Sequence, residues 1–119
     1  MVEKLKNLIP KIETEFGELG LFAMLKMDEI VDKWSLLFAA HWVTDTDEEK
    51  RDRIFEKIYQ LLEEVLTEEE GASVARIGLM PTDTHIVEEL KRLNAEGSTT
   101  LNNMKINGNT VHEGIILKG

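Results

Sequence analysis

The chain contains an unbroken apolar run, Trp34-Ser35-Leu36-Leu37-Phe38-Ala39-Ala40-His41-Trp42-Val43, and this stretch decides the fold. Its odd and even positions are both apolar, which is typical of a strand buried on both faces. A charged segment over 44–49 follows at once, where Thr46 and Glu49 match a helix capping box. Together, the apolar run and the charged segment predict a buried strand that is followed by a crossover helix.

The segments before this run are a helical region and a second apolar run. Apolar residues spaced by three and four over 2–16 predict a helix, which Pro10 should kink or divide into two short helices. Residues 21–25 are again apolar on both faces. We expect a strand there, connected to Trp34 through 27–33, and the alternative is a helix that continues through Ile30.

The segments after the run alternate between helix and strand. A helical stripe over 54–65 precedes a second buried strand over 74–80, which Pro81 ends, and Asp83 or Thr84 then caps another helix. Asn107-Gly108 predicts a hairpin that pairs 99–106 with 109–117. The expected order is α-β-β-α-β-α-β-β. This indicates the α/β (α+β) class, as one domain over 1–119 with a mixed sheet of about five strands.

Composition narrows the class of protein. Of the 119 residues, 42% are hydrophobic, which is enough for a core. The formal charge of -9 argues against nucleic acid and anionic membranes as partners. The chain has no cysteine, which excludes disulfides, thiolate chemistry and cysteine-bound metals. The first residues have no apolar signal region, so we expect a cytoplasmic, prokaryotic protein.

Polar side chains follow the two buried strands. If both crossovers are right-handed and parallel, three strands end at one edge of the sheet, where open α/β sheets bind ligands. The residues expected at that edge are His41, Asp45 and Asp47 after the first strand, Asp83, Thr84 and His85 after the second, and His112 after the hairpin turn.

This edge predicts a metal or anion site. Imidazole and carboxylate suit zinc, manganese or iron, so His41, His85, His112, Asp45 and Asp47 are candidate ligands of a divalent metal in a hydrolase-like enzyme. The alternative is that each histidine is structural and that the aspartates only cap helices.

Other residues at or near the strands are candidates for anion binding. Asp83 and Thr84 begin a helix, and helix N-termini favour anions. Arg76 stands inside a buried strand. It either clamps a carboxylate or phosphate, or forms a salt bridge with, for example, a glutamate of the long helix.

The remaining hypothesis is an interaction module without catalysis of its own. The last strand, 114–117, is apolar, and only Lys118 would guard it if it lay at the edge of the sheet. An N-terminal helix or a second copy of the chain could then cover it, so we expect a homo-oligomer. The small-molecule ligand, if there is one, is not indicated by any motif.

Several segments together resemble a small family of prokaryotic proteins of unknown function. They are Asp32-Lys33-Trp34, the core over 36–40, Trp42, Ala75-Arg76-Ile77 and the closing hairpin. The resemblance covers most of the chain from about residue 21 and implies no activity, cofactor or catalytic residue. Ser35 stands where that pattern has an acidic residue, and His41 where it has a small residue or proline.

Overall fold

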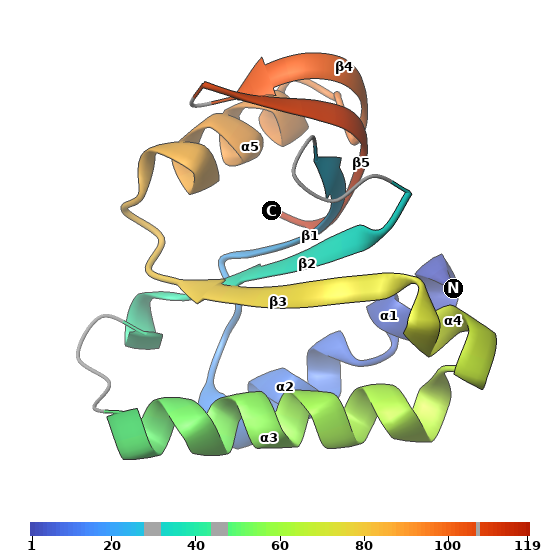
Figure 1. The fold of residues 1–119 in the computed structure, drawn as a ribbon. Helices are drawn as coiled ribbons and strands as arrows, with labels where there is room; N and C mark the ends of the chain where they lie inside the picture. The colour runs from blue at the N-terminus through green and yellow to red at the C-terminus, as the bar shows by residue number, and fades with distance from the viewer. Residues whose placement is uncertain (28–31, 44–47, 107) are drawn as a thin grey trace.

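The computed structural model describes residues 1–27, 32–43, 48–106 and 108–119 (Figure 1). Within them a sheet of five strands has the order β3-β2-β1-β5-β4. The strands are β1 (Leu21–Met27), β2 (Trp34–Ala39), β3 (Val74–Met80), β4 (Thr100–Ile106) and β5 (Asn109–Lys118). Only β2 and β3 are paired in parallel, and the other neighbours are antiparallel. The mixed sheet confirms the predicted α+β class.

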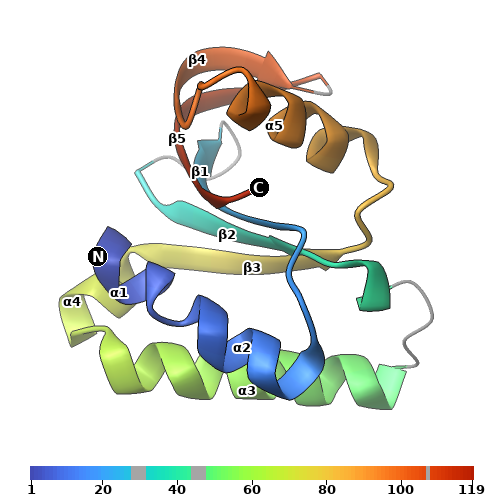
Figure 2. The same cartoon turned by 180° about the vertical axis from the view of Figure 1, so that it is seen from behind.

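Helices cover both faces of the sheet (Figures 1 and 2). They are α1 (Val2–Lys6), α2 (Ile9–Phe16), α3 (Glu48–Val65), α4 (Glu68–Ala72) and α5 (His85–Ala95), with a 3-10 turn η1 (His41–Val43) after β2. The first three helices pack on one face and α5 packs on the other, while α4 lies beside the start of β3. The N-terminal region forms two short helices, as predicted, but the break falls at residues 7–8 and Pro10 lies in the first turn of α2.

Two cores result from the doubly apolar strands. One face of β2 places Leu36 and Phe38 against α1, α2 and α3, and the other face places Leu37 and Ala39 in the core under α5. The strand interpretation of residues 21–25 is confirmed, since β1 is buried on both faces as well. Its alternative, a helix through Ile30, is wrong for residues 21–27.

The predicted direction of β4 is wrong. β5 pairs antiparallel with β1, and β4 pairs antiparallel with β5, so β4 runs opposite to β2 and β3 when the ladders are followed across the sheet. The parallel crossover rule does not apply, because β3 and β4 run in opposite directions. The direction of β4 is fixed by its hairpin with β5 instead.

The last strand does not lie at the edge of the sheet, which was the condition for its being exposed. β5 lies between β1 and β4 and pairs with both. In the described residues the two edges of the sheet are therefore β3 and β4. The covering of an exposed last strand therefore cannot be the reason for self-association.

The helix starts differ from the predicted caps. Thr46 of the expected capping box lies outside the described residues, whereas a capping box that was not predicted joins Thr67 and Glu70 at α4. Thr84 is the N-cap residue of α5, but its hydroxyl donates to the Pro81 carbonyl rather than accepting from the helix. Among the described helices, none combines the length and apolar composition that spanning a membrane requires.

Candidate functional site

The structure separates His112 from His41 and His85, with which the sequence placed it at one edge of the sheet. His41 follows the carboxyl end of β2, and His85 begins α5 after β3. His112 lies in β5 between the residues that pair with Lys26 and Met27, so it stands beside the carboxyl end of β1. That end of β1 pairs with the amino end of β2. His41 and His112 therefore lie at opposite ends of β2, because β4 and β5 do not have the predicted directions.

The remaining predicted metal ligands do not form a described site. Asp45 and Asp47 lie outside the described residues, and Asp83 is exposed beside Thr84. Within the part of the chain that the structure describes, no three His, Asp or Glu side chains are grouped so that they could hold a metal ion.

The side chain of Arg76 lies on the face of the sheet that α5 covers. A salt bridge with the long helix α3 would require it to lie on the opposite face. Its Nε donates to the Ser35 hydroxyl at 3.1 Å, and its Nη2 lies 4.0 Å from the sulfur of Met27. Met27 belongs to the core under α5, whereas α3 packs on the opposite face of the sheet. The suggested pairing with a glutamate of α3 is therefore wrong.

A small polar hollow lies near His112. It has a volume of about 330 Å³ and includes Lys26, Asp32 and Glu113 in its lining. Lys26 pairs with Glu113 at 3.6 Å and lies 4.6 Å from the centre of the Trp34 ring. Opposite charges are thus already paired inside it, so the hollow offers neither a clear anion site nor a clear cation site.

An apolar groove that the sequence did not predict lies elsewhere on the surface. Its volume is about 480 Å³, which is within the usual range for binding pockets. The groove lies between the end of α3, α4 and the start of β3. Its apolar lining is Tyr59, Leu62, Leu66 and Val74, and its polar rim is Glu63, Thr67, Glu68 and Gly71.

Tyr59 is the most unusual side chain of this groove. It is 52% exposed and is the only large hydrophobic side chain classed as exposed among the described residues. Phe55 and Leu66, which are partly buried, continue the same side of α3 toward either end. An apolar row on the surface of a helix is more typical of an interface than of a helix that faces only water.

In Figure 1, β3 lies above α3, the helix that carries Phe55 and Tyr59. Within the described residues β3 pairs only with β2, so one side of its backbone is open. Apart from Arg76 its sequence, VARIGLM, has no charged residue. β4, the other edge, is more polar, with exposed Asn102, Asn103 and Lys105 and a left-handed Asn103 (φ 49°). Polar side chains and irregular backbone protect edges from pairing, so β4 is the protected edge.

Arg51 defines the far end of this surface. Its Nη2 donates to the carbonyl of Leu79 at 2.8 Å, and its guanidinium lies 5.5 Å from the centre of the Phe55 ring. One carbonyl of the open edge is therefore already satisfied. We call the open edge of β3 together with Arg51, Phe55, Tyr59, Leu62 and Leu66 the β3–α3 surface.

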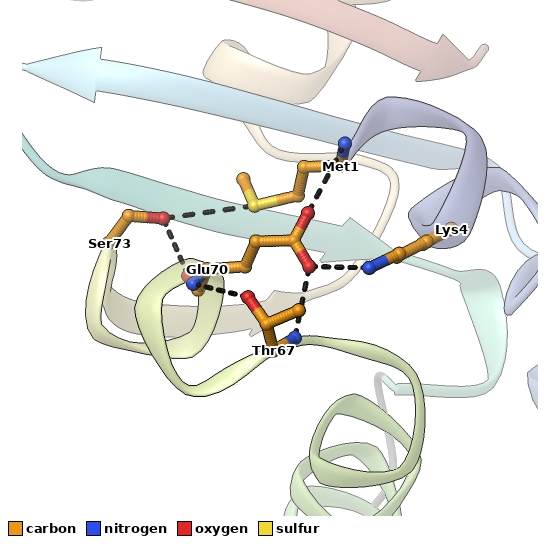
Figure 3. A network of polar contacts seen from close by, with 5 residues as sticks. All are labelled: Met1, Lys4, Thr67, Glu70 and Ser73. Carbon is orange, nitrogen blue, oxygen red and sulfur yellow. Dashed lines mark hydrogen bonds and ion pairs between the residues drawn. The ribbon is translucent and has the colours of Figure 1, made fainter.

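A network of polar contacts holds the α4 wall of the groove in place (Figure 3). The Glu70 carboxylate accepts from Lys4 at 2.6 Å and from the Thr67 amide at 2.9 Å, and it lies 3.5 Å from the amino group of Met1. In return the Thr67 hydroxyl accepts from the Glu70 amide, and the Ser73 hydroxyl donates to the Glu70 carbonyl. These contacts connect α4 to the N-terminal helix.

The same contacts make the network sensitive to acid. The hydrogen bond from Lys4, together with that from the Thr67 amide, lowers the pKa of Glu70 from 4.5 to about 2. A carboxyl whose pKa is lowered by folding stabilises the folded state above its unfolded pKa. That stabilisation is lost as the pH falls from about 4.5 to 2.

We expect Glu70→Gln to remove this part of the acid dependence. Between pH 6 and pH 3, urea unfolding of the variant should show a smaller loss of stability than unfolding of the unchanged protein. Glu69→Gln is the matched control, since it removes the same charge from the neighbouring exposed residue. Equal acid dependence in all three proteins would show that the Glu70 network does not stabilise α4.

No family model, curated protein or solved structure matches the chain. The resemblance to a prokaryotic family of unknown function therefore stays a prediction.

Proposed function

We propose that the chain is a small cytoplasmic interaction module that self-associates through the β3–α3 surface. A single observation carries the proposal: the half-exposed Tyr59 lies in an apolar groove directly beside the unprotected edge of β3. Covering this surface would satisfy two needs at once, because the edge strand requires hydrogen-bond partners and the apolar row is unfavourable in water. A cytoplasmic location agrees with a chain that has no cysteine to oxidise.

The metal-dependent alternative has no comparable support. It requires His41 and His112 to approach one ion, whereas these residues lie at opposite ends of β2. Since metal–nitrogen bonds are about 2 Å long, one ion cannot span that separation. We therefore carry only the interaction module forward as a function.

The energetic contribution of Tyr59 should be large enough to measure. Covering its exposed half removes roughly 100 Å² from water, which is worth about 2.5 kcal/mol per copy. In a symmetric dimer the side chain is covered twice, for a total of about 5 kcal/mol. A change of this size alters a dissociation constant by more than about 100-fold.

We expect Tyr59→Lys to abolish self-association without unfolding the chain. The lysine cannot be buried without a partner, and the exposed position tolerates it in the single chain. Sedimentation equilibrium over a range of concentrations should give a dimer for the unchanged protein and the monomer mass of 13.6 kDa for the variant. Circular dichroism should confirm that both are folded.

Gln60→Lys is the matched control for this experiment. It adds the same side chain to the next, also exposed, residue of α3, outside the groove lining. The control should dimerise like the unchanged protein. A monomer at every concentration of the unchanged protein, or equal dimerisation of both variants, would contradict the proposed function.

A further inference from the structure

We propose that two copies pair about a twofold axis beside Ile77 and Tyr59, so that their β3 strands form one antiparallel ladder in a continuous ten-stranded sheet. In this arrangement Arg51 of each copy reaches the acidic rim of the groove in its partner. The inference rests on the proposed function and adds the geometry, the symmetry and the charged contacts of the pair.

The backbone of β3 presents the N–H and the carbonyl of Ile77 to its open edge, where the Leu79 carbonyl already accepts from Arg51. The Met80 carbonyl accepts from the amide of Ala40, so Met80 faces β2. Successive residues of a strand direct their backbone groups to alternate sides, so Ile77 and Leu79 face away from β2. The contact of Arg51 with the Leu79 carbonyl agrees with this. A twofold axis at Ile77 allows each Ile77 N–H to donate to the Ile77 carbonyl of the other copy.

The position of α3 places Tyr59 at the same level as this axis. Arg51 contacts Leu79 near the end of β3, while Leu66 and Val74 line the groove together at its start. α3 therefore runs opposite to β3. Halfway between these two contacts, α3 has reached residues 58–59 and β3 has reached residues 76–77, so these residues lie at the same level. The exposed ring of Tyr59 thus lies close to the axis, where it would meet its copy.

Charge complementarity identifies a second copy as the occupant. The β3–α3 surface carries Arg51 at one end and the groove carries Glu63 and Glu68 at the other. An antiparallel pair brings Arg51 next to Glu63 of the partner subunit, twice, whereas a parallel pair would bring like charges together. Complementary charges across an interface fix its register and suppress other arrangements. A second copy related by a twofold axis therefore complements the charges of this surface.

Distances between spin labels can test this geometry. The chain has no cysteine, so single-cysteine variants carry one label per copy. Asp52, Glu56, Gln60 and Glu64 are exposed and lie four residues apart, on one side of α3. With the axis near residue 58, a label at 56 or 60 and the same label in the partner subunit are offset along the α3 helices by about 5–8 Å. This offset grows to about 17–20 Å at 52 and 64, at 1.5 Å per residue.

The expected result is a label distance that is shortest at 56 and 60 and longer at both 52 and 64. Equal distances at all four positions would indicate parallel helices and would overturn the twofold arrangement. Long distances throughout in a confirmed dimer would overturn both the arrangement and the surface. The absence of any dimer in sedimentation would instead contradict the proposed function itself, so the two failures can be told apart.

A charge exchange tests the contact between Arg51 and Glu63. Arg51→Glu and Glu63→Arg should each weaken dimerisation by about tenfold or more, because each places like charges across the interface. The double variant should restore the original affinity to within about threefold, since it exchanges the charges without changing their sum. Additive weakening in the double variant would contradict the contact.

Discussion

Replacing Phe38 by alanine is expected to lower the free energy of unfolding by about 3–5 kcal/mol. Phe38 is fully buried in β2, and its ring stacks on Phe22 of β1 with 4.2 Å between the ring centres. The substitution removes apolar contact and leaves a cavity between the sheet and its helices. Domains of this size are stable by only about 5–15 kcal/mol, so the change is a large part of the total.

Urea unfolding followed by circular dichroism measures this loss. Phe16→Ala is the matched control: Phe16 also pairs with an aromatic ring, that of Trp42 at 5.9 Å between centres, but it is only partly buried. Its loss should be clearly smaller. If Phe38→Ala cost less than about 1 kcal/mol, the core between β1, β2 and the α1–α3 layer would not be packed as described.

Gly17→Ala is expected to destabilise the fold by about 1–3 kcal/mol through its backbone alone. Gly17 ends α2 with φ 118° and ψ 172°, a conformation that is almost exclusive to glycine. An added Cβ would also lie 3.0 Å from Cδ1 of Trp42. The ring can move away only by disturbing the hydrogen bond that its Nε1 donates to the Glu18 carbonyl at 3.0 Å.

Gly97→Ala separates these two causes. Gly97 also has a positive φ, of 91°, but a Cβ there would meet no atom within 4 Å. Thermal unfolding should therefore show a decrease in stability for both variants and a greater one for Gly17→Ala. Equal decreases would mean that Trp42 does not restrict the chain at the end of α2.

Local sequence patterns were sufficient for most elements of the fold. Residues 21–25 and 35–40 of the two apolar runs are buried in the structure, because helices cover both sides of the sheet, whereas 41–43 form a 3-10 turn in which His41 is exposed. Pro10 lies in the first turn of α2, just after the break between the two N-terminal helices, and Gly108 takes the positive φ (80°) that a tight turn requires. These features depend on a few neighbouring residues, so a single sequence contains them.

Strand order could not be obtained in the same way. The positions of β4 and β5 depend on pairing between residues more than 90 positions apart, such as Ala23 with Ile116. An apolar strand is compatible with a central place as well as with an edge. The three histidines were consequently placed at one end of the sheet, and an edge position was considered for β5.

The groove was missed although its signals were in the sequence. Tyr59 lies outside the apolar stripe over 54–65, which indicates a side chain turned away from the core. Thr67 and Glu70 match the spacing of a capping box and so indicate a separate helix after α3. What no local pattern could supply is the proximity of both features to the open edge of β3.

The most direct test of self-association through this edge is amide hydrogen exchange at Ile77, measured by NMR at increasing protein concentration. Ile77 N–H faces away from β2, whereas the neighbouring Gly78 N–H faces β2 by the same alternation. The account predicts fast exchange at Ile77 in dilute protein and slow exchange in concentrated protein, with Gly78 protected throughout. Exchange at Ile77 that does not change with concentration would contradict pairing of the β3 edge with a second copy.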